Sequence, residues 1–158
     1  MRKHQKGFSL IELLIVVAII LIIAAIAIPN LLRSRMAANE ASAVGSLRTI
    51  DTAEMTYSST YPDVGYSDLG SLGGAAPCVS ATSTSACLID EVLSVAKVKS
   101  GYAFTAVAAG GVPAVNYTST ALPSIVGSSG QRAFCSDQSG VIRYNTVGAT
   151  CDSSDSPL

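Results

Sequence analysis

The chain has 158 residues, of which 49% are hydrophobic, and its formal net charge at pH 7 is −1. This length suits one ordinary domain, but the apolar fraction is high for a wholly soluble protein. The single histidine is His4. Nucleophilic sites that need a histidine base, and metal sites that rely on histidine ligands, are therefore excluded from the rest of the chain.

The N-terminal part of the chain is long and apolar enough to cross a bilayer. Residues 13–28 are sixteen consecutive apolar positions, and the window 8–28 is interrupted only by Ser9 and Glu12. At about 1.5 Å of rise per residue, a helix over this window spans roughly 30 Å, the thickness of the hydrocarbon core.

Basic residues on the two sides of this segment predict its orientation. Arg2, Lys3 and Lys6 precede it, whereas Arg33 and Arg35 follow it. Positive side chains tend to stay on the cytoplasmic side, and the second group weakens this bias without cancelling it. We therefore expect a cytoplasmic N-terminus and an exported body, in a compartment where cysteines form disulfides.

Glu12 is the feature that a plain membrane anchor does not explain. A carboxylate in the hydrocarbon costs on the order of 2.5–3.5 kcal/mol, so a partner for it is expected. A secretory signal peptide is the other simple interpretation. The apolar region is long for such a signal, however, and residues 28–32, IPNLL, lack a clear small-x-small cleavage site.

The segment KGFSLIELLIVVAIILIIAAIAIP, within residues 6–30, resembles the class III signal of type IV pilins and of the related pseudopilins of type II secretion. The shared features are a short basic leader ending in glycine, an aromatic residue, a glutamate four positions later and a long apolar helix. The resemblance implies that a membrane-embedded prepilin peptidase cleaves between Gly7 and Phe8 and methylates the new amino terminus. Residues 1–7 are then the leader.

The resemblance also implies roles for two further residues of the segment. Glu12 of an incoming subunit would pair with the amino terminus on Phe8 of its neighbour, so that neither charge is buried alone. Pro29 could end the helix or kink it. Family members usually carry a proline here within a long helix, so we expect a kink.

A helical period continues beyond Pro29. Apolar side chains recur at steps of three or four residues on one stripe: Ala37, Ala41, Val44, Leu47, Ile50, Ala53 and Tyr57. Charge around the helix is expected from Arg35, Glu40, Arg48 and Asp51. Tyr61-Pro62 should stop the helix, which gives a stalk helix over residues 8–58 of roughly 75 Å.

The segment after this helix is rich in Gly, Ser, Thr, Ala and Pro over residues 59–87 and predicts an exposed loop. The four cysteines of the body are Cys78, Cys87, Cys135 and Cys151, and four cysteines allow three connectivities. Nearest-neighbour pairing, Cys78–Cys87 and Cys135–Cys151, is preferred, with reduced cysteines as the alternative. The spacings contain no CxxC pair, which disfavours a zinc site.

Residues 88–96, LIDEVLSVA, predict a short helix with Leu88, Val92 and Val95 on one side. Segments of strand-forming composition follow, separated by Gly, Pro and other turn residues. They cover residues 101–108, 114–119, 131–137 and 140–145.

A helix followed by a meandering sheet predicts an α+β fold. We expect three or four antiparallel strands packed on the helix stripe, with Phe134 and Val141 facing each other near a hairpin. This order is similar to that of pilin heads. The expected organisation is a leader over residues 1–7, the stalk helix over 8–58 with its membrane and assembly segment at 8–28, and a globular head over 59–158 with an αβ-loop and a C-terminal disulfide loop.

Other chemistry has weak support in the sequence. Acidic residues are scattered through the body and are interpreted as solvated surface charge rather than acid–base pairs: Asp63, Asp68, Asp90, Glu91, Asp152 and Asp155. Asp152 and Asp155 could contribute to a calcium site like that of major pseudopilin heads, but CDSSDSPL lacks a dense run of oxygen ligands. No cofactor or metal is therefore expected. Without the leader the chain has seven basic and eleven acidic residues, which disfavours nucleic acid as a partner.

These observations predict a structural subunit rather than an enzyme: a type IV pilin held in the inner membrane, processed, and polymerised through its apolar helix into a surface filament for adhesion, motility or DNA uptake. The resemblance implies other pilin subunits, the prepilin peptidase and methylase, and an ATPase-driven inner-membrane assembly platform as partners. One alternative is a pseudopilin of a periplasmic pseudopilus. Another is a membrane-anchored periplasmic binding module, which would keep its N-terminus and be indifferent to Glu12.

Overall fold

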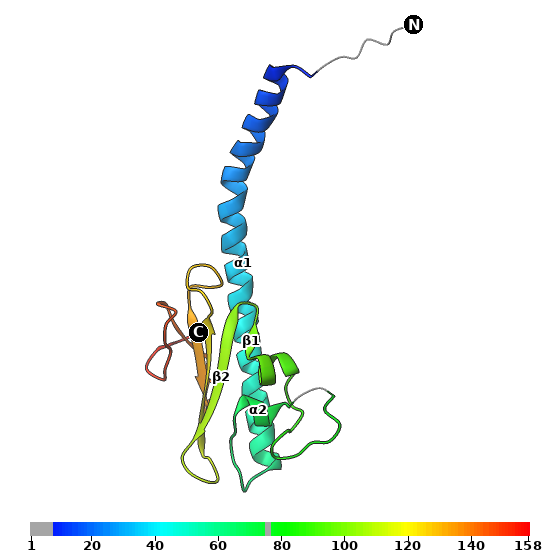
Figure 1. Cartoon of the computed structure of the whole chain (residues 1–158). Helices are drawn as coiled ribbons and strands as arrows, with labels where there is room; N and C mark the ends of the chain where they lie inside the picture. The colour runs from blue at the N-terminus through cyan, green and yellow to red at the C-terminus, as the bar shows by residue number, and fades with distance from the viewer. Residues whose placement is uncertain (1–7, 75–76) are drawn as a thin grey trace. The chain divides into compact units, whose positions relative to one another are not determined.

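The structure of the chain is a computed structural model that describes residues 8–74 and 77–158. The chain divides into two compact units, Met1–Arg35 and Met36–Leu158, and each is described by itself. Helix α1, Leu10–Thr60, contributes its first half to one unit and its second half to the other (Figure 1). The expected leader, with Gly7, lies outside the described residues.

Helix α1 begins and ends beside recognisable sequence signals. The carbonyl oxygen of Ser9 accepts a hydrogen bond from the N–H of Leu13 at 3.2 Å and so closes the first turn. The last helical residue is Thr60, because Pro62 disfavours the helical conformation at Tyr61. Pro29 lies inside α1, so the helix continues past this residue instead of ending at it.

The second unit adds an antiparallel sheet to the second half of α1. In the described part of the chain the sheet has six strands: β1 (Val98–Lys99), β2 (Tyr102–Ala109), β3 (Asn116–Pro123), β4 (Ala133–Asp137), β5 (Arg143–Asn145) and β6 (Ser156–Pro157). Each strand pairs with the next in the sequence. A short helix α2 (Leu69–Leu72) and a π-helical turn η1 (Val92–Ala96) precede it. The predicted α+β class is confirmed.

The core of this unit lies between α1 and the sheet. Strand β2 alternates strictly at its start, with Tyr102 and Phe104 buried and Thr105 exposed. The buried side chains belong to one apolar cluster with Leu47 and Ile50 of α1. Since burying such a side chain contributes about 1.5–3 kcal/mol, this cluster is the main force that holds the helix to the sheet.

The buried face of α1 differs from the predicted stripe. Ala37 and Ala41 are exposed, whereas Glu40 and Asp51, expected as surface charges, are buried. The rest of the second unit, sheet and loops together, covers the face on which the following residues lie: Glu40, Ala43, Val44, Ser46, Leu47, Ile50, Asp51, Ala53, Glu54 and Tyr57. Polar residues are tolerated on this face because strands and loops supply hydrogen bonds to them.

The segment 88–96, predicted as a short helix, also buries a different side from the one that carries Val92 and Val95. Ile89 and Leu93 belong to the core, while Val92 and Val95 are exposed. The segment forms the turn η1 instead of a regular helix, and Lys97 ends it in the left-handed conformation with φ 56°. The wider turn places Leu93, not its two valine neighbours, against the core.

The pairing expected between Phe134 and Val141 is wrong. Phe134 lies opposite Tyr144 in the β4–β5 ladder, and Val141 lies in the connection before β5 and is 38% exposed. The turn begins with a hydrogen bond from the N–H of Gly140 to the carbonyl of Asp137 at 2.9 Å. Pairing resumes only at Arg143, so the loop is longer than the turn residues alone suggested. The sheet of the described residues has six strands instead of the expected three or four. Strands β1 and β6 have two residues each and are too short to be recognised in the sequence.

Candidate functional site

Two of the residues that the sequence singled out for processing and assembly lie around the start of α1. Phe8 precedes the helix and is 76% exposed, and Glu12 lies in the first turn of α1 and is exposed too. An acidic side chain is favoured at a helix N-terminus by the helix dipole, though only by about 0.3–1 kcal/mol in water. Gly7, the other half of the expected cleavage site, lies outside the described residues.

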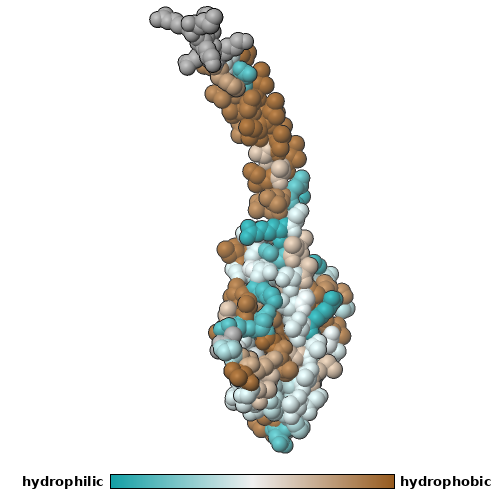
Figure 2. Space-filling view, turned by 90° about the vertical axis from the view of Figure 1, so that its right-hand side faces the viewer, coloured by the Kyte–Doolittle hydropathy of each residue, from teal (hydrophilic) through white to brown (hydrophobic). Residues whose placement is uncertain are grey.

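An apolar surface surrounds Glu12 and continues along the first half of α1. Its exposed large side chains are Phe8, Leu10, Ile11, Leu13, Leu14, Ile15, Val16, Val17, Ile19, Ile20, Leu21, Ile22, Ile23, Ile26, Ile28, Leu31 and Leu32. Figure 2 shows them as a nearly uninterrupted brown surface. Among the described residues, α1 is the one helix that is long and apolar enough to cross a membrane, judged by length and composition. Such a surface requires lipid or protein to cover it.

No cation lies near Glu12 in the sequence of this surface. Between Phe8 and Leu32 the chain contains no Lys, Arg or His, and the first basic residue after them is Arg33. A buried carboxylate without a cation is strongly unfavourable. If lipid or protein covers the apolar surface, Glu12 therefore has no cationic side-chain partner within residues 8–32 of its own chain.

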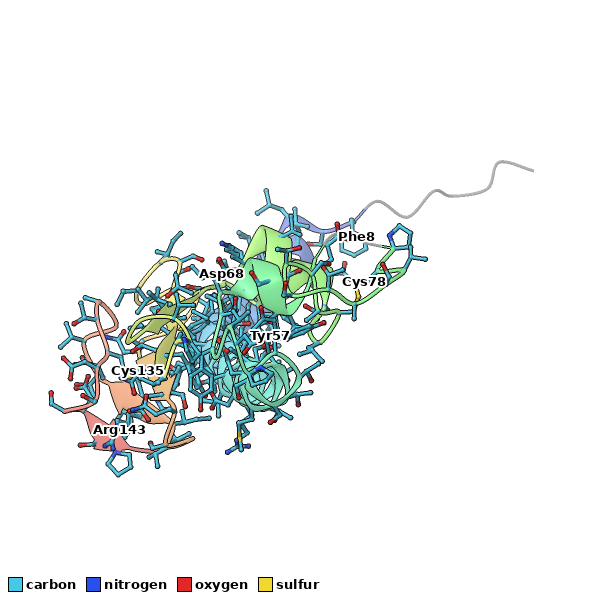
Figure 3. The ribbon with its side chains drawn as sticks, turned by 90° about the horizontal axis from the view of Figure 1, so that it is seen from below. Phe8, Tyr57, Asp68, Cys78, Cys135 and Arg143 are labelled. Atoms are coloured by element: carbon cyan, nitrogen blue, oxygen red, sulfur yellow. A yellow bond between two sulfur atoms is a disulfide. The ribbon has the colours of Figure 1, made fainter. Side chains whose placement is uncertain are left out.

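The second unit contains two disulfides, Cys78–Cys87 and Cys135–Cys151, and no free cysteine among the described residues. This is the pairing that the sequence analysis preferred. Cys135 lies in β4 and Cys78 in the loop after α2, on opposite sides of α1 (Figure 3). Each disulfide therefore stabilises a different part of the unit.

Glu40 fixes the segment before β4 to α1. Its Oε1 accepts the N–H groups of Gln131 at 2.9 Å and Arg132 at 3.1 Å, and its Oε2 accepts Nε of Arg132 at 2.9 Å. Burial alone would raise the pKa of Glu40, but these donors and the charge of Arg132 outweigh it and hold the pKa below its usual value. The guanidinium also lies 5.3 Å from the ring centre of Phe134. Glu40 is therefore ionised and structural.

Asp51 is the second buried acid on α1. It accepts hydrogen bonds from the hydroxyls of Tyr117 at 3.0 Å, Ser119 at 3.4 Å and Ser136 at 2.8 Å. Burial raises the pKa of Asp51, the three hydroxyls oppose this, and the charge of Asp137 adds to it, with a net upward shift. The pKa of Tyr117 is raised as well, by burial and by this carboxylate.

Glu54 is the third buried acid, and the sequence analysis did not single it out. Its side chain is fully buried, and its Oε2 accepts the N–H of Ser67 at 3.1 Å. Its position was nevertheless visible in the sequence: Glu54 follows Leu47 by seven residues and Ile50 by four, which places it on the buried stripe. A charged residue on this apolar stripe was a sequence signal for a buried acid.

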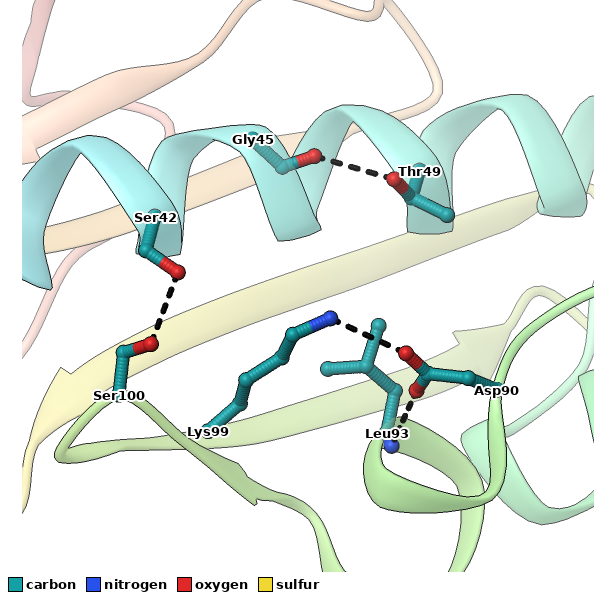
Figure 4. A network of polar contacts seen from close by, with 7 residues as sticks. All are labelled: Ser42, Gly45, Thr49, Asp90, Leu93, Lys99 and Ser100. Carbon is teal, nitrogen blue, oxygen red and sulfur yellow. Dashed lines mark hydrogen bonds and ion pairs between the residues drawn. The ribbon is translucent and has the colours of Figure 1, made fainter.

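The acids that were expected at the surface stabilise local turns. Asp90 pairs with Lys99 at 3.0 Å and accepts the N–H of Leu93 at 2.8 Å (Figure 4). Burial alone would raise the pKa of Asp90, but the N–H of Leu93 and the charge of Lys99 lower it below its usual value. Asp68 caps α2 by accepting the N–H of Ser71 at 2.8 Å.

Asp152 and Asp155 belong to the C-terminal disulfide loop. Asp152 accepts the hydroxyl of Ser154 at 2.6 Å, and hydrogen bonds from Ser154 lower its pKa. Asp155 accepts the amide of Asn145 at 2.9 Å. Its carboxylate lies within 4.8 Å of the sulfurs of Cys135 and Cys151, but these are bonded to each other and are not available as metal ligands.

The fold and the exposed apolar segment define a class of proteins in which an N-terminal helix carries an α+β head. The family described as "Prokaryotic N-terminal methylation motif" matches residues 2–28. The N-terminal segment of this chain is therefore similar to a prokaryotic N-terminal methylation motif.

Two curated proteins are similar to the chain. One is the type IV wide pilus major component PilA4 of Thermus thermophilus, 63% identical over 38 residues, which are 24% of this chain and 29% of that protein. The other is the type IV major pilin protein PilA of Myxococcus xanthus, 43% identical over 74 residues, which are 47% of this chain and 33% of that protein. The chain spans about a third of the length of these relatives. No solved structure matches the chain.

Proposed function

We propose that the chain is a structural subunit of a type IV pilus, which polymerises through the apolar segment of α1. The observation that supports this most directly is the exposed apolar surface between Phe8 and Leu32, together with the match of the methylation motif over residues 2–28. Lipid covers this surface before assembly, and the same segments of neighbouring subunits cover it afterwards. The role needs packing and register, and no catalytic chemistry from this chain.

In this proposal the prepilin peptidase cleaves between Gly7 and Phe8, and the new amino group on Phe8 is methylated but remains cationic. Glu12 of an incoming subunit pairs with that group on a neighbour. The absence of Lys, Arg and His between Phe8 and Leu32 supports this assignment, because no nearer cation is available to a covered Glu12. The pair offsets the cost of burying either charge alone.

The subunit is held in the inner membrane before assembly, with its N-terminus in the cytoplasm and its head outside. Arg2, Lys3 and Lys6 ahead of the apolar segment support this orientation. The two disulfides support an oxidising compartment for the head. An inner-membrane platform and its ATPase would extract the subunits into the filament.

Mass spectrometry of N-terminal peptides tests the proposal, with filaments sheared from intact cells compared with the membrane fraction. We expect an abundant sheared peptide that begins at N-methylated Phe8. Processed peptide confined to membranes would instead indicate a periplasmic pseudopilus. An uncleaved Met1–Gly7 leader would indicate a plain anchor and contradict the proposal.

A variant pair tests the role of Glu12 in the same cells. Glu12→Ala should remain in the membrane fraction but disappear from the sheared fraction, because loss of one member of a buried pair costs about 3–5 kcal/mol. Glu91→Ala changes an exposed acid of the second unit and serves as the control that should assemble normally. Normal assembly of the Glu12→Ala variant would remove the pairing from the proposal.

A further inference from the structure

Glu54 occupies a place that a carboxylate normally avoids. The side chain is 0% exposed, and it extends from the part of α1 that belongs to the second unit. One oxygen, Oε2, accepts the N–H of Ser67 at 3.1 Å. The other, Oε1, is buried and has no hydrogen-bond partner among the described residues. An ionised carboxylate in this place leaves half of its charge unsolvated, which is costly.

The ionisable groups that face Glu54 add to this cost. The negative charges of Asp51 on α1 and Asp68 after the helix both raise the pKa of Glu54. The charge of Glu54 in turn raises the pKa of the Tyr117 hydroxyl on β3. Neither ion pair of the described residues includes any of these groups. Lys97 lines an open groove with Asp68 but is not among the groups that change the pKa of Glu54.

The N–H of Ser67 reaches Glu54 from residues 61–68, the connection between α1 and α2 that we call the cover segment. Its two ends are held by Tyr61, which packs on Tyr57 and the core, and by Asp68, which caps α2. Between these ends, Tyr66 donates its N–H to the carbonyl of Ala114 at 3.1 Å, and Ala114 donates its N–H to the carbonyl of Val64 at 2.8 Å. The ring of Tyr66 lies 4.8 Å from that of Tyr117. The segment has no strand pairing beyond one isolated bridge, Gly65 to Ala114. A short segment whose middle has so few contacts can open locally, about its anchored ends, at a free energy below that of global unfolding.

We propose that Glu54 and the cover segment form a pH-dependent flap, which is closed over the protonated carboxyl in mildly acidic solution and opens as the carboxyl ionises. Burial, with the charges of Asp51 and Asp68, raises the pKa of Glu54 to about 7 against the opposing hydrogen bond from Ser67. In the open flap the carboxyl meets water and has its ordinary pKa near 4.5.

The direction of the effect follows from proton binding. Between the two pKa values the closed flap binds the proton and the open flap has lost it, so a rise in pH favours opening. The population of the open flap rises from about pH 4.5 to about pH 7 and then levels off. The flap is a property of the second unit and does not depend on filament assembly.

Hydrogen exchange measured by mass spectrometry tests the proposal on the full chain in detergent micelles. Labelling at pH 5.5 and pH 8 is corrected for the intrinsic exchange rate. We expect the protection of the amides of residues 61–68 to fall roughly 30-fold between these pH values, while residues 117–121 of β3 keep theirs. Glu54→Gln should abolish the pH dependence, and the exposed control Glu91→Gln should retain it. Equal protection at both pH values in the unmodified chain, or an unchanged pH dependence in Glu54→Gln, would overturn the proposal.

A second measurement does not depend on any variant. The chain has four glutamates, Glu12, Glu40, Glu54 and Glu91, so the carboxyl carbons can be followed by NMR after labelling glutamate with ¹³C. We expect one of these signals to titrate with a midpoint near 7. Midpoints below 5.5 for all four signals would overturn the proposal even if Glu54→Gln failed to fold.

Discussion

The hydroxyl of Tyr117 shows how a buried carboxylate is accommodated at the scale of one residue. It donates to Asp51 at 3.0 Å in a fully buried setting. Tyr117→Phe should lower the free energy of unfolding by about 1–2 kcal/mol, because one acceptor then loses its donor. Chemical denaturation followed by circular dichroism in one detergent measures this change.

Tyr144→Phe is the matched control for that experiment. Tyr144 lies in β5 and is half-buried, and its hydroxyl makes no hydrogen bond with the described residues. Its loss should change the free energy of unfolding by less than about 0.5 kcal/mol. Equal losses of unfolding free energy in the two variants would show that the hydrogen bond from Tyr117 to Asp51 does not stabilise the second unit.

Two of the residues that the sequence placed wrongly are charged residues of α1. Glu40 and Asp51 were assigned to the surface because acids are almost never fully buried unless they are paired. Their partners, Arg132 and Tyr117, follow them by 92 and 66 residues, and no local pattern indicates such distant pairing. The predicted roles of Phe8 and Glu12, by contrast, rest on a signal that is local in the sequence.

The C-terminal disulfide is the clearest stabilising device at the scale of the elements. It joins Cys135 in β4 to Cys151 over a sequence separation of 16. Replacing both cysteines by alanine should lower the free energy of unfolding by about 3 kcal/mol, from the loop-closure entropy that the crosslink removes from the unfolded chain. Thermal denaturation under oxidising conditions measures the loss.

The Cys78–Cys87 pair provides the comparison. Its sequence separation is 9, and both cysteines lie at exposed positions. Its double alanine variant should lose less, about 2.6 kcal/mol or below, because no strand depends on it. A larger loss from this pair than from Cys135–Cys151 would contradict the assignment of the main crosslink to β4.

Elements with a clear local pattern could be predicted, and elements without one could not. The end of α1 followed from Tyr61-Pro62, and β2 and β4 followed from strand-forming residues bounded by turn residues. Strands β1 and β6 have two residues each, too few to show a period. The β4–β5 register required the length of a loop, which Val141 and Gly140 alone did not reveal.

The pH dependence of stability is a prediction for the head as a whole. The pKa of Glu54 is raised to about 7 and that of Asp51 is raised too, so their stabilising contribution is complete below about pH 4 and is lost as pH rises towards 7. The loss should reach up to about 3 kcal/mol for Glu54. The pKa of Glu40 is lowered, so its contribution is lost in the opposite direction, as pH falls below its ordinary value.

Denaturation midpoints between pH 3 and pH 8.5 measure these opposing effects. We expect a maximum of stability near pH 4 to 5 and a decline from there towards pH 7. Stability that rises steadily between pH 5 and pH 7 would contradict the assignment of Glu54 as a buried, unpaired acid.

The second unit alone and the full chain should also differ in their solubility. A chain truncated to residues 36–158 lacks the exposed apolar surface that begins at Phe8. It should be soluble without detergent and monomeric in analytical ultracentrifugation, whereas the full chain requires detergent. Association of the truncated chain at micromolar concentration would reveal a second contact surface on the head.

The strand order has a consequence for how the second unit folds. Each strand pairs only with its neighbour in the sequence, so the sheet can grow one hairpin at a time as the chain emerges, and low sequence separation favours rapid folding. The slow event is then the closure of this finished sheet onto α1. The salt bridge between Glu40 and Arg132, which spans 92 residues, forms in that closing step. A variant that lacks this salt bridge should therefore fold more slowly but reach the same structure.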